Sequence, residues 1–72
     1  MVGQIKSVKS KGFGWIATQI GIDFFFHQSA YQGDFKTLLR DYALGQKPKV
    51  MFDMDESSDR GPRALNVVKL EG

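Results

Sequence analysis

Two short segments of this 72-residue chain place aromatic rings beside basic side chains. Residues 11–16 read Lys-Gly-Phe-Gly-Trp-Ile and residues 23–29 read Asp-Phe-Phe-Phe-His-Gln-Ser, and together they hold five of the nine aromatic residues. Drawn as strands, both segments put rings on the face that also carries Lys11 or His27. Rings displayed beside cations predict a surface that stacks on flat, negatively charged molecules, and single-stranded nucleic acid fits that description.

The three consecutive phenylalanines take different roles if their segment forms a strand. Successive side chains of a strand point to opposite faces. Phe24 and Phe26 are therefore predicted to enter the core, whereas Phe25 and His27 point the other way.

Glycines alternate with the aromatic residues of the first segment. Gly12 and Gly14 alternate with Phe13 and Trp15, so both rings share one face of the predicted strand. The glycines leave the opposite face bare, which suits close packing inside a narrow barrel.

Five strand-like segments are expected to position these residues. They run from about Val2 to Lys9, Phe13 to Thr18, Ile22 to His27, Lys49 to Asp55 and Arg63 to Leu70. The spacing of three between the apolar anchors Ile5 and Val8 breaks strict alternation and predicts a bulge or a sharp bend. Only three residues separate the second and third segments, which predicts a tight hairpin.

The long connection between the third and fourth strands contains the one helix candidate. Within residues 35–42, Phe35, Leu38, Leu39 and Tyr42 fall at i, i+3, i+4 and i+7, which places them on one helical face. Gly45 is positioned to end this helix.

Five short strands in one domain, residues 1–72, are too few for two sheets with a large core. Closing them into a small all-β barrel removes the sheet edges and lets one set of side chains fill the interior. The expected core consists of Ile5, Ile16, Phe24, Phe26, Val50, Phe52, Leu65 and Val67.

Charge is distributed unevenly although the formal net charge is only +2. Residues 1–22 contain Lys6, Lys9 and Lys11 and no acid; residues 53–59 contain four acids and no base. A positive face of this kind steers polyanions even near neutrality. The acidic run lacks the ligand spacing of a calcium loop, so it is expected to be a solvated strand edge and turn. Gly61-Pro62 closes the polar turn, residues 56–60.

The residues resemble one known family, the cold-shock domain. Lys11–Ile16 resembles its first ribonucleoprotein motif and Phe24–His27 its second. Further matching stretches follow in the family's order, namely Ser29-Ala30, Gln32–Leu38, Gly45–Lys47 and Gly61–Val67. An RNA-recognition motif uses a related string, but it places about forty residues before that string, and only ten precede it here.

The resemblance implies a fold, a function and a set of site residues. The fold is an antiparallel five-stranded barrel of the oligonucleotide-binding (OB) type, and the implied function is binding single-stranded RNA or DNA, with an RNA-chaperone role. Base stacking is implied for Phe13, Trp15, Phe25, His27 and Phe35. Contacts to the backbone or base edges are implied for Lys6, Lys11 and Arg63; Lys9 adds a further cation for phosphates.

Two positions depart from the family pattern. Ser7 stands where an aromatic residue is usual in the first strand, and Gln28 stands where a phenylalanine usually follows the histidine. Each base–aromatic stack is worth roughly 1–3 kcal/mol, so we expect weaker binding than in a typical member. An insertion around Leu39–Ala43 lengthens the loop after Phe35, and it either extends the binding surface or covers the open end of the barrel.

Several alternatives remain open. Phe35 could simply pack the helix, and the exposed apolar side of the barrel could bind a protein instead of a nucleic acid. No catalytic constellation is present, and a single histidine without cysteine predicts no metal site and no cofactor. No small-molecule substrate and no membrane partner are expected, because the domain is too small for a deep cleft and no apolar run approaches about 18 residues. The chain is expected to be a cytoplasmic monomer.

Overall fold

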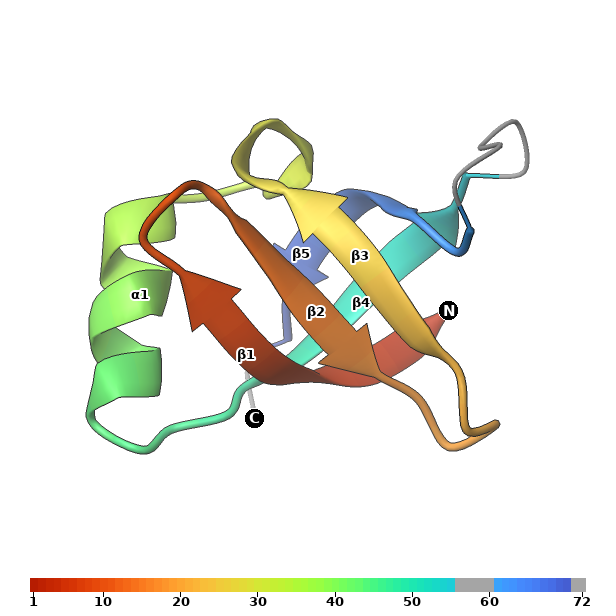
Figure 1. The fold of residues 1–72 in the computed structure, drawn as a ribbon, viewed down its shortest axis with the longest axis horizontal. Helices are drawn as coiled ribbons and strands as arrows, with labels where there is room; N and C mark the ends of the chain where they lie inside the picture. Colours follow the sequence, from red (N-terminus) through yellow and green to blue (C-terminus); the bar gives the residue numbers. More distant parts are fainter. Residues whose placement is uncertain (56–60, 71–72) are drawn as a thin grey trace.

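Five antiparallel strands form one curled sheet in a computed structural model that describes residues 1–55 and 61–70 (Figure 1). The strands are β1 (Val2–Lys9), β2 (Phe13–Ala17), β3 (Asp23–His27), β4 (Lys49–Met54) and β5 (Ala64–Lys69). Their order across the sheet is β3-β2-β1-β4-β5. The predicted strands were therefore right, with ends that differ by at most one residue.

Two tight turns connect the first three strands because glycine supplies the left-handed backbone that each turn needs. Gly12 has φ +100° and donates its N–H to the carbonyl of Lys9 at 3.0 Å. Gly21 has φ +81° and donates to the carbonyl of Thr18 at 3.2 Å. Residues other than glycine rarely adopt such φ values.

The bulge predicted in the first strand is confirmed. Ile5 pairs with Ile16, but the next pair is Ser7 with Trp15, so Lys6 is the extra residue of β1. The bulge returns Val8 to the inner face, and both Ile5 and Val8 are buried.

A second bulge, in β5, overturns the expectation that Leu65 lies inside. Met51 pairs with Val68 and Asp53 pairs with Leu65, so β5 contains one more residue than β4 over this stretch. Asn66, with φ +51°, lies in the irregular stretch. The inward positions of β5 are consequently Ala64 and Val67, three residues apart, and Leu65 is 43% exposed.

The core lies between the curled sheet and the helix, and it contains the other predicted residues. The buried hydrophobic side chains are Ile5, Val8, Ile16, Phe24, Phe26, Leu38, Val50, Phe52, Ala64 and Val67. The rings of Phe24 and Phe52 meet with centroids 5.1 Å apart. The inward assignment of Phe24 and Phe26 from alternation is thus confirmed.

The sheet is not closed by a ladder of hydrogen bonds, in contrast to the expected closed barrel. The edge strands β3 and β5 approach each other, and Phe25 donates its N–H to the carbonyl of Pro62 at 3.0 Å. Between these strands the described residues show only an isolated parallel bridge, between Phe25 and Arg63. The architecture is consistent with the predicted all-β OB fold, with its edges brought together rather than abolished.

The helix α1 (Phe35–Ala43) covers one end of the sheet, as Figure 1 shows. It ends as expected: Gly45, with φ +86°, donates to the carbonyl of Tyr42, and Gln46 donates to that of Asp41, both at 2.9 Å. Leu38 is buried, and Leu39 packs against the core. The inserted segment thus forms the second half of a core-covering helix.

The short 3-10 helix η1 (Gln28–Ala30) links β3 to this helix. The predicted polar turn 56–60, which includes two of the four acids of the acidic run, lies outside the described residues. Within the described part of the chain, α1 and η1 are both too short and too polar to cross a membrane.

Candidate functional site

Four side chains form a continuous surface on the outer side of β2 and β3. Trp15 is paired with Phe25, and Phe13 is paired with His27, so alternation puts all four on the same side. The ring centroids of Phe13 and Phe25 are 5.6 Å apart, and those of Trp15 and Phe25 are 5.4 Å apart in an edge-to-face arrangement. We call these four residues the aromatic face.

The aromatic face is exposed because the inner side of β2 has no room for further side chains. A Cβ added to Gly14 would lie 2.7 Å from the ring of Phe26 and 2.7 Å from the carbonyl oxygen of Ser7. The core thus fills the space beneath β2, and the rings of this strand remain outside. Trp15 is 38% exposed and Phe13 is half-buried.

Arg63 joins the aromatic face from the far end of the chain. The Phe25–Pro62 hydrogen bond brings the start of β5 against β3, and the Arg63 guanidinium carbon lies 5.3 Å from the centroid of the Phe25 ring. Trp15, Phe25, Pro62 and Arg63 line a hollow of about 380 Å³. A cation over a ring face is a favourable contact, so the hollow combines flat apolar walls with one fixed positive charge.

His27 is held in one orientation by the first residues after its strand. The backbone N–H of Ser29 donates to Nδ1 of His27 at 3.1 Å. Since Nδ1 accepts this hydrogen bond, the neutral ring carries its proton on Nε2, the ring nitrogen that is not bonded to Ser29. The imidazole therefore offers a donor and a flat face at the exposed end of β3.

The predicted basic residues differ in what surrounds them. Lys9 is paired with Phe13 across the sheet, and Lys11 lies in the turn before β2; both are exposed. Neither has an ion-pair partner among the described residues. Lys6 differs, since its Nζ lies 2.6 Å from Oδ2 of Asp23.

Phe35 lies at the start of α1, and its observed ring contacts are with residues outside the aromatic face. Its ring contacts those of Phe26 and Tyr31, with centroids 6.3 and 6.4 Å away. Phe35 is half-buried and packs against the core. These contacts match the alternative in which it packs the helix.

The two departures from the aromatic pattern lie on either side of the aromatic face. Ser7 is paired with Trp15 on β1, and Gln28 follows His27, where its side chain lies beside Gly12. No ring stands at either position, so the surface is narrower than it would be with aromatic residues there.

Sequence reasoning missed two residues at the site. Pro62 lines the hollow beside Phe25, which no local pattern indicates because the contact joins distant strands. Asp23 lies on the side of β3 that carries Phe25 and His27; alternation could have found it, since it is two residues before Phe25.

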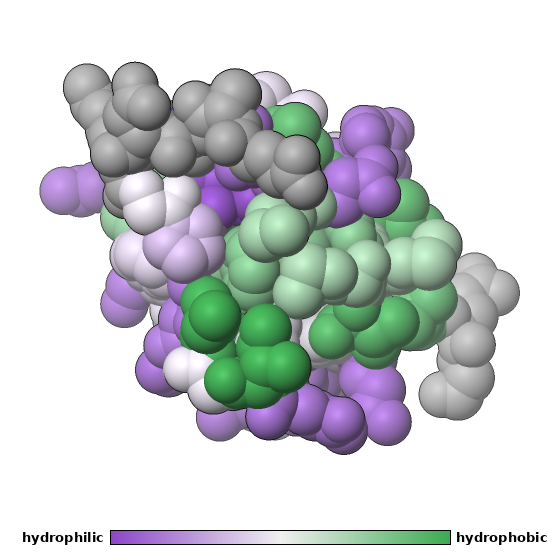
Figure 2. Space-filling model, turned by 90° about the vertical axis from the view of Figure 1, so that its right-hand side faces the viewer, coloured by the Kyte–Doolittle hydropathy of each residue, from purple (hydrophilic) through white to green (hydrophobic). Residues whose placement is uncertain are grey.

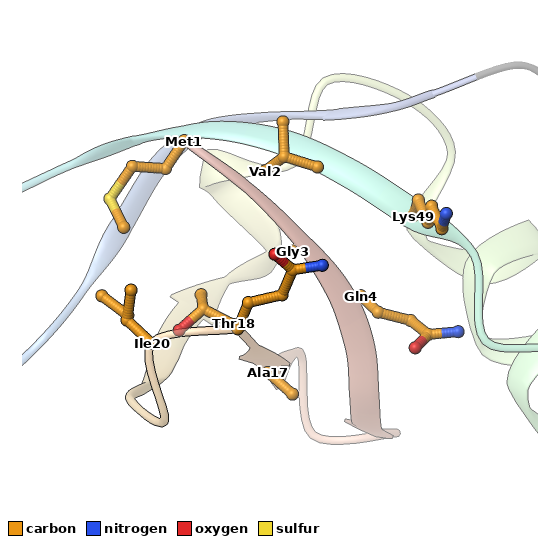
Figure 3. A pocket seen from close by; sticks show the side chains of 9 residues that line it. Met1, Val2, Gly3, Gln4, Ala17, Thr18, Ile20 and Lys49 are labelled. Carbon is orange, nitrogen blue, oxygen red and sulfur yellow. The ribbon is translucent and has the colours of Figure 1, made fainter.

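A larger groove lies elsewhere, between the start of β1 and the β2–β3 turn (Figure 3). It measures about 490 Å³, and Met1, Val2, Ile20 and Lys49 are among its lining residues. Figure 2 shows hydrophobic surface gathered on the end of the molecule that faces right in Figure 1. The aromatic face and this groove are separate surfaces.

The described residues contain no group of three or more histidine or acidic side chains placed to hold a metal ion. The aromatic face consists of exposed rings bordered by basic side chains. Proteins that bind single-stranded nucleic acids use arrangements of this kind.

Comparison with known proteins agrees with this geometry. Residues 1–70 match the family described as the 'Cold-shock' DNA-binding domain. The chain is 56% identical over 59 residues to "Cold shock protein 1" of Lactiplantibacillus plantarum, covering 81% of this chain and 79% of that protein. It is 51% identical over 61 residues to "Major cold shock protein" of Streptococcus pyogenes serotype M1, covering 83% of this chain and 81% of that protein.

A third relative is matched along nearly its whole length. The chain is 43% identical over 72 residues to "Cold shock-like protein CspE" of Bacillus anthracis, with 97% of both chains covered. Together with the match over residues 1–70, these similarities show that the chain belongs to the cold-shock domain family, which is known for binding nucleic acids.

Proposed function

We propose that this protein binds single-stranded RNA or DNA on its aromatic face with little sequence preference. The observation that carries the proposal is the grouping of Phe13, Trp15, Phe25 and His27 on one exposed side of the sheet. Every base has a π-face, so stacking on such rings holds a strand without reading its sequence.

Basic residues around the rings hold the phosphates in this proposal. Lys9 and Lys11 border the aromatic face on one side, and Arg63 borders Phe25 on the other. Lys6 differs from these residues because its side chain is paired with the carboxylate of Asp23. Phe35 contributes at most a marginal contact, since its ring is turned to Phe26 and Tyr31.

Binding of this kind supports an RNA-chaperone role. A strand whose bases are stacked on protein cannot pair with another strand, so transient binding melts misfolded RNA without an energy source. The proposed activity is non-catalytic and needs no cofactor, and we place it in the cytoplasm with the protein acting as a monomer.

The fluorescence of Trp15 tests the proposal directly, because Trp15 is the chain's only tryptophan and lies in the proposed site. A pyrimidine-rich single-stranded heptamer should quench its emission, and affinity should fall with salt at a log–log slope of about −0.7 per neutralised phosphate. The same heptamer annealed to its complement is the control and should bind much more weakly. Unchanged emission at near-millimolar oligonucleotide would contradict the proposal.

The apolar groove near Met1 favours a second candidate, a protein-interaction domain. Its lining includes Ile20, which is 64% exposed, and Lys49. Ile20→Ser separates the two functions, because it alters the groove without touching the aromatic face. If the variant still bound the oligonucleotide but no longer supported the protein's function in cells, the second candidate would be favoured.

A further inference from the structure

A row of apolar side chains crosses the outer side of three neighbouring strands. Val2 of β1 is paired with Met51 of β4, and Met51 is paired with Val68 of β5. All three residues are exposed, by 57%, 48% and 37% respectively. The solvated side of an antiparallel sheet usually carries polar residues, so this row marks a surface that another molecule can cover. We call these three residues the apolar row.

Charged residues of opposite sign lie on either side of the apolar row. Lys49 precedes Met51 by two residues on β4 and Asp53 follows it by two, so alternation puts both on the outer side of the strand, each about 7 Å from Met51. Neither has an ion-pair partner among the described residues. Asp53 accepts a hydrogen bond from Asn66 at 3.0 Å, and a carboxylate accepts more than one. The outer side of β4 therefore carries, in order, a cation, an apolar residue and an anion.

This order of charges is complementary to itself. When two copies pack with their apolar rows face to face and a two-fold axis along the row, Met51 meets Met51, and Lys49 of each copy meets Asp53 of the other. An axis along β4 would instead place lysine against lysine and aspartate against aspartate. The charges therefore select one of the two ways of covering the row, and the occupant that satisfies them is a second copy of this chain.

We propose that the apolar row is a self-association surface through which two copies form a two-fold symmetric dimer. The strands β4 and β5 lie behind β2 and β3 in Figure 1, so the apolar row and the aromatic face point away from each other. Each copy thus keeps its own nucleic-acid site, and binding at that site needs one copy only. The inference goes beyond the proposed function and does not depend on it.

Substitution of Met51 tests the surface. A small contact gives a weak dimer, with a dissociation constant on the order of 0.1–1 mM, so sedimentation equilibrium across that range should show a reversible monomer–dimer equilibrium. Met51→Lys should remain monomeric, because it places two like charges on the two-fold axis. Leu44→Lys is the matched control: it makes the same change in charge at a residue that is 70% exposed at the end of α1, and it should associate as the unsubstituted protein does. Thermal unfolding verifies that each variant is folded.

Exchange of the flanking charges tests the orientation of the two copies. Lys49→Asp should weaken association roughly tenfold, because two attractive contacts become two repulsive ones. The double variant Lys49→Asp/Asp53→Lys again places opposite charges against each other and should regain the association constant of the unsubstituted protein. Added salt should reduce the difference between Lys49→Asp and the unsubstituted protein, because it screens exposed charges.

Four outcomes would overturn the inference. An unsubstituted protein that stays monomeric throughout the concentration range would show that no second copy covers the row. Dimers of Met51→Lys would place the interface elsewhere, and a double charge variant that does not recover would reject the two-fold arrangement. Quenching of Trp15 by the heptamer should be equal in Met51→Lys and the unsubstituted protein, and its loss in that variant alone would assign the row to the nucleic-acid site instead.

Discussion

Adjacent residues of the same type can lie on opposite sides of a strand, and Phe24 and Phe25 are the clearest case. Phe24 is 1% exposed and meets Phe52 in the core, whereas Phe25 faces outward between Trp15 and Arg63. Nothing but strand alternation separates their roles. The dipeptide therefore places a core residue, Phe24, next to a proposed binding residue, Phe25.

Alanine at each position should produce opposite defects. Phe25→Ala should weaken oligonucleotide binding by roughly 1–3 kcal/mol because a stacking ring is lost, with little change in unfolding temperature. Phe24→Ala should cost about 3–5 kcal/mol of stability because it leaves a core cavity. Oligonucleotide titration and denaturant unfolding measure the two effects, and Phe24→Leu supplies a milder core variant. Equal binding by Phe25→Ala and the unsubstituted protein would remove Phe25 from the site.

At the scale of elements, α1 is a short helix that depends on the capping of both its ends. At its start, Asp34 accepts from the backbone N–H of Lys36 at 3.0 Å and from the Thr37 hydroxyl at 3.1 Å. At its end, Gly45 takes the left-handed conformation that closes the last turn. Nine-residue helices are marginal alone, so these caps and the burial of Leu38 must hold it.

Removal of the N-terminal cap should destabilise the protein without changing its site. Asp34→Ala should lower the free energy of unfolding by about 0.5–2 kcal/mol, whereas Asp34→Asn keeps an acceptor and should lose much less. Urea unfolding of the two variants provides the comparison. Equal losses would show that the carboxylate charge, rather than the cap, matters at this position.

At the scale of the whole molecule, Tyr31 links the elements on which the fold depends. It forms a bridge with Val67 of β5, and its ring contacts Phe26 of the core and Phe35 of α1. Burial raises the pKa of Tyr31 above its ordinary value of 10.0, and the carboxylates of Asp41 and Asp34 raise it further. The folded protein thus holds this proton more tightly than the unfolded chain does.

The raised pKa has a direct consequence for alkaline stability. The contribution of Tyr31 is present below pH 10 and is lost as pH rises through the raised pKa, because the unfolded chain then binds fewer protons than the folded protein. Tyr31→Phe keeps the ring and has no proton to lose, so its stability should fall less above pH 10. Denaturant unfolding across this pH range measures the difference, and parallel curves would contradict the assignment.

The sequence by itself determined the strands, the helix and the side of the sheet on which each ring lies. These features follow from local rules: alternation along a strand, spacing of apolar residues on a helix, and glycine where the backbone turns. The inward Phe26 and outward Phe13 needed no knowledge of distant contacts. The β1 bulge was predictable too, since the spacing of Ile5 and Val8 marks it.

Only the tertiary structure decided which distant residues meet. The Lys6–Asp23 ion pair spans three strands, and the placement of Arg63 over Phe25 depends on β5 approaching the edge of β3. The β5 bulge, which turned Leu65 outward, left no mark in the spacing because a small alanine took the inner position. Register and strand order arise from packing across the whole sheet, and local alternation carries no information about either.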